Sequence, residues 1–199
     1  VCSSDLYFRG GDMHYVDQNG DHRIDSKDRV ALGSAAPDFF GGFYTQFKYK
    51  GFALGAEFSY SKGNMAYNAV RNQLEGMNTL GNQSIAVLNR WSLDGQVTNM
   101  PRVQHNDPYR STSFSERWLE DASYLRMKSV TLSYSFDKTV LNFFRSGTLY
   151  VSGENLLTAT KYLGLDPEFS YSYGETSQGL DYAKMVQPKS VKFGVNLKF

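Results

Sequence analysis

Apolar and polar residues alternate along the end of the chain, KSVKFGVNLKF (189–199). Because successive side chains of a β-strand point to opposite faces, this segment predicts a strand with one apolar and one polar face. Its length suits a tilted strand that crosses a membrane, which needs about 9–11 residues, although a strand of a soluble sandwich shows the same alternation. The apolar set consists of Val191, Phe193, Val195, Leu197 and Phe199.

The same pattern predicts four earlier strands, at 39–49, 52–61, 124–136 and 147–157. Lys50-Gly51 lies between the first two, and a turn signal between two alternating runs predicts a hairpin. In the last of the four, the alternation weakens after Gly153. A short helix is predicted at 65–74. The chain is therefore predicted to be all-β, with about five antiparallel strands.

The connections between these strands alternate in length. Those at 50–51 and 137–146 are short, whereas those at 63–123 and 158–188 are long and polar. Outer-membrane barrels have short periplasmic turns and long extracellular loops, so this alternation favours a barrel over a sandwich. It predicts that both long connections, and the polar segment 15–38, are extracellular loops.

Aromatic residues gather at the ends of the predicted strands, which is typical of the two interfacial girdles of a membrane barrel. The alternative explanation is that Tyr and Phe are simply common here, at 14 each. The residues in question are Phe39, Tyr49, Phe52, Tyr60, Tyr124, Phe136, Tyr150 and Phe199.

Composition excludes several classes of protein. A formal charge of +1 over 199 residues gives no general attraction to nucleic acid or to an anionic surface. Cys2 is the only cysteine, so no intrachain disulfide can form. Residues 1–10 are interpreted as a truncation edge or a sequence scar, with any export signal upstream. Five strands cannot close a barrel, so we expect residues 11–199 to be part of a larger barrel whose other strands are N-terminal.

Several segments resemble one family of membrane proteins. VSGENLLTATKYLGLDPE (151–168) is similar to the near-terminal signature of SusC/RagA-type TonB-dependent outer-membrane transporters. RWLEDASYLRMKSVTLSYSF (117–136) resembles the strand that precedes this signature, and YVDQNGDHRIDSKDRVALGSAAPDFFGGF (15–43) resembles a third block of the family. The segment from NRW to MPR (89–102) is a weaker match. The order and combination of these blocks carry the resemblance.

The resemblance implies the C-terminal portion of a transmembrane β-barrel of the 22-stranded class. It also implies TonB-energised uptake of glycans or peptides across the outer membrane of a Gram-negative, Bacteroidetes-like bacterium. A SusD-like surface lipoprotein would cover the barrel mouth, and outer-membrane lipid would surround the wall. The plug and the segment that contacts the TonB complex are N-terminal in this family, so this chain alone is not expected to transport.

An acidic segment matches the spacing of a calcium-binding loop, with acidic or amide side chains at positions 1, 3, 5, 9 and 12 and a backbone carbonyl at position 7. Ca²⁺ takes six to eight oxygen ligands, which this set can supply. His22 stands where glycine usually makes the sharp turn. The alternative is a solvated acidic turn. The predicted ligands are Asp17, Asn19, Asp21, Arg23, Asp25 and Asp28.

Other candidate residues are fewer. Trp91 and Trp118 either anchor the long connection or stack on sugar rings, and anchoring is the favoured interpretation. Charged residues of the strands are expected on the polar face, as solvated wall charges or as contacts for a passing substrate: Lys48, Glu57, Glu154 and Lys192. The sequence shows no nucleophile–base pair, glycine-rich phosphate loop or His/Cys cluster, so we do not expect an enzyme.

Two other functions remain open at this point. One is a secreted β-domain, stiffened by calcium, that acts in adhesion or glycan binding and would be a soluble monomer. The other is a passive porin, which would need no TonB. The importer is the favoured hypothesis because its membrane-facing strands, long outer loops and family resemblance agree.

Overall fold

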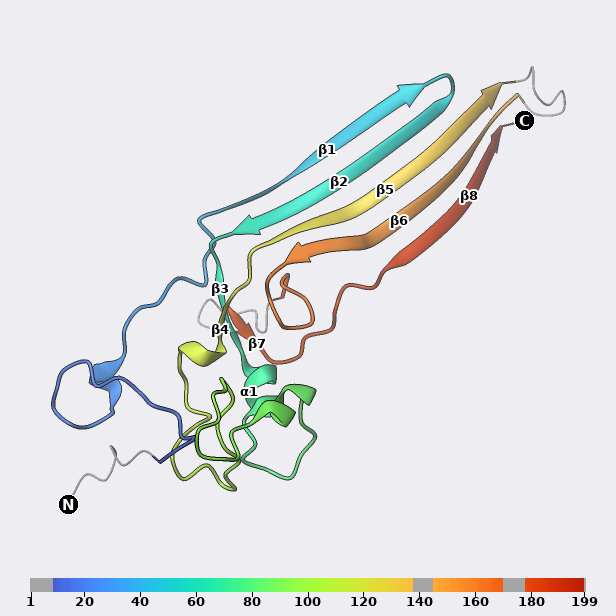
Figure 1. Ribbon diagram of the computed structural model, residues 1–199. Helices are drawn as coiled ribbons and strands as arrows, with labels where there is room; N and C mark the ends of the chain where they lie inside the picture. Colours follow the sequence, from blue (N-terminus) through green and yellow to red (C-terminus); the bar gives the residue numbers. More distant parts are fainter. Residues whose placement is uncertain (1–8, 138–144, 170–177, 199) are drawn as a thin grey trace.

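The computed structural model describes residues 9–137, 145–169 and 178–198. Its largest element is a five-stranded antiparallel sheet in the order β1-β2-β5-β6-β8, so that strands adjacent in the sheet follow one another along the chain (Figure 1). β1 and β8 form the two edges. The strands are β1 (Phe39–Tyr49), β2 (Phe52–Lys62), β5 (Tyr124–Asp137), β6 (Ser146–Thr160) and β8 (Ser190–Lys198).

The five predicted strands are confirmed, with small differences at their ends. The helix predicted at 65–74 is only partly right, because its first residues form a strand, β3 (Met65–Asn68), and α1 begins afterwards (Ala69–Glu75). The side chain of Asn68 accepts a hydrogen bond from the backbone N–H of Arg71 at 2.9 Å and so caps the helix. Pairing with a distant strand therefore overrides the local helix propensity as far as Asn68.

A second, three-stranded sheet lies at one end of the large sheet, where the long connections gather (Figure 1). Its central strand β3 pairs antiparallel with β4 (Leu119–Asp121) and parallel with β7 (Leu180–Asp181). Three 3₁₀ helices accompany it: η1 (Ser26–Asp28), η2 (Ile85–Asn89) and η3 (Glu116–Trp118). The first long connection is therefore folded and not irregular. We call residues 9–15, 64–123, 161–169 and 178–182 the cap.

The weakened alternation after Gly153 has a structural cause. The pairing of β5 with β6 shifts register between Met127 and Ser129, and Asn155 adopts a left-handed φ of 51°. A β-bulge of this kind adds unpaired residues and re-aims the side chains that follow. The alternation of β6 is therefore interrupted at Asn155 and Leu156, although the strand remains paired up to Thr160.

The strand register brings most of the apolar residues of the five strands to one face of the sheet. Phe43 stacks on Phe58 with ring centroids 4.8 Å apart, and Phe52 packs against Tyr134 at 4.5 Å. Phe193 on the edge strand is 81% exposed. So large an exposed apolar surface marks a face that is covered by something else. The apolar face includes Phe43, Phe47, Phe52, Leu54, Phe58, Leu132, Leu149, Val191, Phe193, Val195 and Leu197.

The buried clusters of the described residues lie in the cap. One joins Ala66, Ala122 and Tyr162, and the other joins Met77, Val87 and Met100. The large sheet is thus a single layer, whereas the cap has interior packing of its own. Among the described residues, no helix has the length and apolarity that a membrane crossing requires.

Candidate functional site: the polar face of the sheet and the cap

The opposite face of the sheet is lined mainly by small polar side chains and carries the charges predicted from the sequence. Glu154 and Lys192 form an ion pair at 2.5 Å, and Ser190 donates a hydrogen bond to Glu154 at 2.9 Å. The hydroxyl of Ser129 lies 3.4 Å from the carboxylate of Glu57. The structure therefore places these charges on one face, as predicted, where they bind each other or neighbouring hydroxyl groups. We call this the polar face; it includes Gln46, Lys48, Glu57, Ser129, Thr131, Ser133, Ser152, Glu154 and Lys192.

A large aromatic side chain lies against part of the polar face. The ring of Tyr150 covers Gly194 of the adjacent strand, and a Cβ added to this glycine would come within 2.1 Å of the ring. Glycine at this position therefore allows the aromatic ring to approach the backbone closely.

The junction between sheet and cap is held by ion pairs at the bulge. Arg126 is almost fully buried and binds Asp166, and its guanidinium lies 3.1 Å from Glu168. Lys128 donates to both carboxylate oxygens of Glu168, at 2.7 and 2.6 Å. These contacts fix the connection that follows β6 against β5.

Asp166 is one of the two carboxylates of this junction. Burial alone would raise its pKa, but the hydrogen bond from Arg126 and the backbone N–H groups of Glu168 (2.9 Å) and Gln187 (3.1 Å) outweigh it, so the pKa of Asp166 lies below its usual range. The side chain is thus held in its charged form by three donors, two of which are backbone groups.

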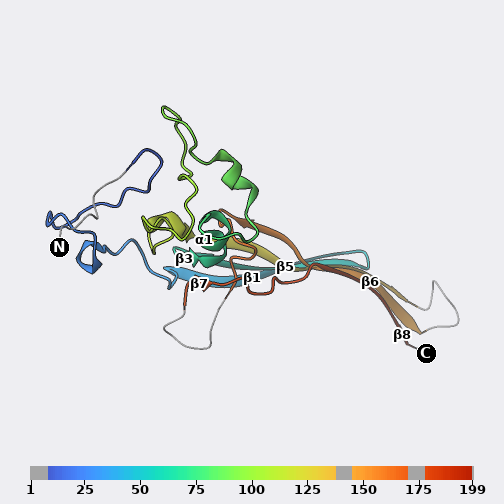
Figure 2. The same ribbon diagram turned by 90° about the horizontal axis from the view of Figure 1, so that it is seen from below.

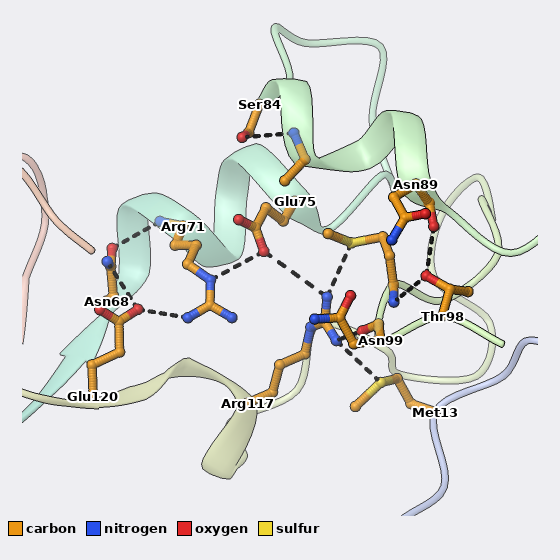
Figure 3. Close-up of polar contacts among 12 residues, drawn as sticks. Met13, Asn68, Arg71, Glu75, Ser84, Asn89, Thr98, Asn99, Arg117 and Glu120 are labelled. Carbon is orange, nitrogen blue, oxygen red and sulfur yellow. Dashed lines mark hydrogen bonds and ion pairs between the residues drawn. The ribbon is translucent and has the colours of Figure 1, made fainter. Parts of the chain in front are cut away.

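A buried polar network organises the cap (Figure 3). Arg71 on α1 lies 3.1 Å from Glu75 and 2.6 Å from Glu120 of β4. Glu120 also accepts hydrogen bonds from the side chain of Asn68 at 3.3 Å and from the backbone N–H of Leu163 at 2.8 Å. Although burial opposes its charge, these two carboxylates raise the pKa of Arg71. One glutamate therefore joins α1, β3, β4 and the connection that follows β6.

Trp118 lies at the centre of this network and is 1% exposed. The guanidinium carbons of Arg71 and Arg117 lie 5.5 and 4.9 Å from its ring centroids, within the range of cation–π attraction. Arg117 also donates to the backbone carbonyl of Asn99 at 2.6 Å. The expectation that Trp118 anchors the long connection is confirmed by its burial.

The first described residues run across the cap. Arg102 binds Asp12 at 2.6 Å, and Tyr15 donates to the carbonyl of Arg110 at 2.6 Å. Trp91 lies against Gly11, whose φ of 81° and lack of a Cβ allow the indole ring to approach. Trp91 is therefore also an anchor, because it holds residues 9–15 against the rest of the cap.

A second link lies within the second long connection, at 158–188. The Tyr162 hydroxyl donates to Asp181 at 2.6 Å, and both side chains are buried. Burial, followed by this hydrogen bond to a carboxylate, raises the pKa of Tyr162. An open pocket of about 340 Å³ lies beside this link, between Phe40 and Tyr124 of the sheet and Phe169 of the cap.

The predicted calcium loop folds as a tight turn. The carboxylate of Asp17 accepts the backbone N–H groups of Gly20 at 2.7 Å and His22 at 2.8 Å, and His22 adopts a left-handed φ of 61°. Asp25 and Asp28 form a capping box around η1. Within 9–137, 145–169 and 178–198, no three His, Cys, Asp or Glu side chains are arranged to hold a metal ion. Calcium binding therefore stays a prediction.

The cap network was not identified from the sequence. Arg71 and Glu75 have the i, i+4 spacing of a helical ion pair, which is a detectable signal. Glu120, by contrast, is separated from Arg71 by 49 residues, and no local pattern predicts that they meet.

Comparisons with known proteins agree with this architecture. No family model matches the chain. TonB-dependent receptor P3 of Formosa agariphila is 32% identical over 197 residues, which are 96% of this chain and 19% of that protein. TonB-dependent receptor SusC of Bacteroides thetaiotaomicron is 26% identical over 188 residues, or 93% of this chain and 17% of that protein.

Solved structures give the same result. A chain in the structure of the RagAB peptide transporter matches with a TM-score of 0.73 and 28% identity, over 89% of this chain and 19% of that chain. The RagAB peptide importer in its 'open-open' state matches over 93% of this chain, also with a TM-score of 0.73.

The chain thus spans about a fifth of the length of the curated relatives it matches. These relatives are transporters and receptors, which confirms the expectation that the chain is not an enzyme. The blocks of sequence that resemble the family, the single-layer antiparallel sheet with one apolar face, and the matched structures agree. The chain belongs to the SusC/RagA-type TonB-dependent transporters, and its five-stranded sheet corresponds to part of their β-barrel.

Proposed function

We propose that this chain forms part of the wall and the outer end of an outer-membrane importer of nutrients. The observation that carries the proposal is the division of the large sheet into an apolar and a polar face. A membrane barrel has its apolar side chains toward lipid and its polar ones toward the lumen, whereas a sandwich buries the apolar face against a second sheet. The names of the relatives support import as the activity.

The proposed orientation follows from the two ends of the sheet. The cap lies at one end, and the Lys50-Gly51 turn and the end of β8 lie at the other (Figure 1). Because barrels of this type have long outer loops and short inner turns, the cap is on the extracellular side. The relatives from Formosa and Bacteroides support the proposed localisation, which is the outer membrane of a Bacteroidetes-like bacterium.

The partners and substrate are part of the same proposal. Import is energised by TonB through a part of the protein outside this chain, and a SusD-like surface lipoprotein covers the extracellular mouth. The cargo is an oligosaccharide or a peptide; one matched structure is described as a peptide transporter. The polar face suits such cargo because its hydroxyl groups bind neutral polar groups and its Glu154–Lys192 pair is internally neutralised.

Spin labels on neighbouring residues of β8 test the division into two faces. The full-length protein, reconstituted in lipid, would carry single labels at Phe193 and Val195 or at Lys192 and Asn196. Labels on the first pair should collide strongly with oxygen, which dissolves in lipid, and weakly with a water-soluble nickel complex. Labels on the second pair should show much weaker collision with oxygen.

The result also separates the importer from its alternatives. A secreted β-domain with a sandwich core would bury Phe193 and Val195, so labels there would be protected from both reagents. A passive porin would show the same alternation as an importer, but uptake by cells would not depend on TonB. Loss of uptake on deletion of TonB therefore distinguishes the two membrane proteins.

We also propose that the acidic loop between Asp17 and Asp28 binds calcium and so stiffens an outer loop. The turn is supported by Asp17, which accepts two backbone N–H groups of the loop. Binding requires Asp21 and Asp25 to rotate toward a common point, because they now accept backbone N–H groups at 2.9 and 2.7 Å.

A further inference from the structure

The acidic loop contains the only asparagine of the chain that is followed by glycine, Asn19-Gly20. An asparagine side chain loses ammonia when the backbone nitrogen of the next residue attacks its amide carbon, a reaction that contributes to the thermal lability of asparagine. Glycine in the next position leaves the attacking nitrogen unhindered, because glycine has no Cβ. The sequence thus singles out this pair as the asparagine with the least steric protection.

The backbone nitrogen of Gly20, which would make the attack, is held beside a base. Its N–H donates to the carboxylate of Asp17 at 2.7 Å. A carboxylate in hydrogen-bond contact can take the proton that the nitrogen loses as it attacks. Gly20 adopts a left-handed φ of 74°, which glycine tolerates without strain, so this contact is kept at little cost.

The amide of Asn19, which would be attacked, is held by Asp21. Its oxygen accepts the backbone N–H of Asp21 at 2.9 Å, and its nitrogen donates to the carboxylate of Asp21 at 3.0 Å. The first contact closes an Asx turn, which folds the side chain of Asn19 back over the Gly20 peptide. Because negative charge develops on the amide oxygen during the attack, the N–H group that points at it stabilises the transition state.

Water, which completes the reaction, has access to this turn. Asn19 and Gly20 are both exposed. Apart from the two chain neighbours of Gly20, no described residue has an atom within 4 Å of the place where a Cβ on Gly20 would lie. The blue segment that contains η1 and this turn lies at the cap end of the molecule, away from the large sheet, in both views (Figure 1, Figure 2).

We propose that Asn19 deamidates spontaneously in the folded protein, with Asp17 as the base. A bond forms between the Gly20 nitrogen and the side-chain carbon of Asn19, the bond from that carbon to the side-chain nitrogen breaks, and ammonia leaves with the proton taken from Gly20. Water then opens the resulting cyclic imide at either of its carbonyl carbons and gives aspartate or isoaspartate. Water is the only co-reactant, and the inference does not rest on the proposed function.

The modification changes the loop in one of two ways. Aspartate at position 19 adds a negative charge between Asp17 and Asp21. Isoaspartate lengthens the main chain by a methylene group inside the segment across which Asp17 accepts the N–H groups of Gly20 and His22, and so disrupts the turn. In either case the change is one-way, because the ammonia is lost to solvent.

Peptide mapping of the full-length protein, incubated at neutral pH without calcium, tests the proposal. Cleavage after Arg9 and Arg23 releases residues 10–23, in which Asn19 is the only asparagine. We expect this peptide to acquire, over the incubation, the mass of a carboxylate in place of the amide, with fragmentation locating the change at Asn19. Asn82 is also exposed but is followed by Gln83, and should stay unchanged in the same sample.

Two variants test the role of Asp17. Asp17→Asn removes the base but keeps an acceptor for the N–H of Gly20. The matched control, Asp25→Asn, removes a charge from the same loop, but Asp25 accepts the N–H of Lys27 at 2.7 Å instead of that of Gly20. We expect Asp17→Asn to slow the conversion of Asn19 about tenfold, which is less than the base of an active site contributes, and the control to convert at the wild-type rate.

Three outcomes would overturn the inference. If Asn19 keeps its amide in the folded wild type, the turn holds the reacting atoms apart. If Asp17→Asn converts as fast as the wild type, or if both variants slow equally, Asp17 is not the base. If Asp17→Asn converts faster than the wild type, the turn that Asp17 closes protects the asparagine instead of promoting its reaction.

Discussion

Replacing Glu120 with glutamine tests whether the cap is held together by its buried polar network. The substitution keeps the shape of the side chain and an acceptor for the backbone N–H of Leu163, but it removes the negative charge. Arg71 would then be paired with Glu75 alone. Since Glu120 joins four segments, the loss should loosen all of them together.

The magnitude follows from the burial of the two partners. Breaking a fully buried ion pair costs about 3–5 kcal/mol. The side chain of Glu120 is only 8% exposed, but that of Arg71 is 21% exposed and keeps Glu75, so a smaller value is expected. A charge-assisted hydrogen bond contributes about 1.5–3 kcal/mol, and we expect a cost of about 2 kcal/mol.

Hydrogen exchange of the full-length protein measures this cost locally. The N–H of Tyr67 in β3 donates to the carbonyl of Gly179 at 2.7 Å and exchanges only when the small sheet opens. A cost of about 2 kcal/mol corresponds to exchange about 30-fold faster at this amide. Amides in the middle of β5 and β6 should not change.

The matched control is Glu116→Gln, because Glu116 is an exposed acidic residue four positions earlier. Surface substitutions of this kind usually change stability by less than about 0.5 kcal/mol. If exchange in β3 stayed at the wild-type rate in the Glu120 variant, or rose equally in the Glu116 control, the ion-pair network would not be what holds the cap.

Three further predictions concern other parts of the chain. Because the pKa of Asp166 is lowered on folding, its contribution to stability is present above the unfolded value of about 3.9 and is lost as the pH falls through the folded pKa. Protection of the 161–169 amides from hydrogen exchange should therefore fall as the pH drops through this interval. A D166N variant that kept the same acid transition would refute the role of Asp166. Gly194→Ala should force the Tyr150 ring off the polar face and destabilise the full-length protein by about 1–3 kcal/mol in urea unfolding; an unchanged midpoint, or an equal loss in Asn196→Ala, would contradict it. Terbium should luminesce when it binds the acidic loop of the full-length protein, and calcium should displace the terbium and so remove this luminescence. Asp17→Ala should also remove the signal, whereas a signal that survives this change would locate the ion elsewhere.

Strand prediction succeeded because the large sheet is a single layer with two different environments. In a strand the side-chain period is two, so an apolar surface on one face and a polar surface on the other must be written directly into the sequence. The pattern weakened only after Gly153, where the bulge at Asn155 interrupts the alternation. A bulge is a property of two paired strands, so the weakened alternation of one strand does not by itself identify it.

The cap was underpredicted for a different reason. The connection at 63–123 was predicted to be a long polar loop with one short helix, but Met65–Asn68 forms a strand because it pairs with Leu119–Asp121 and with Leu180–Asp181. These partners are more than 50 residues away, and short segments of this kind have no periodicity of their own. Only the folded chain brings them together.

The candidate site divides along the same line. The sequence by itself determined the all-β class, the five strands, the face on which Glu57, Glu154 and Lys192 lie, and the family resemblance, because each of these depends on local alternation or on contiguous blocks of residues. Only the tertiary structure decided that Glu120 joins Arg71 to Leu163 and that Arg126 and Lys128 hold the second long connection. Those contacts are formed by residues far apart in the chain, and their energy depends on burial, which the order of residues does not specify.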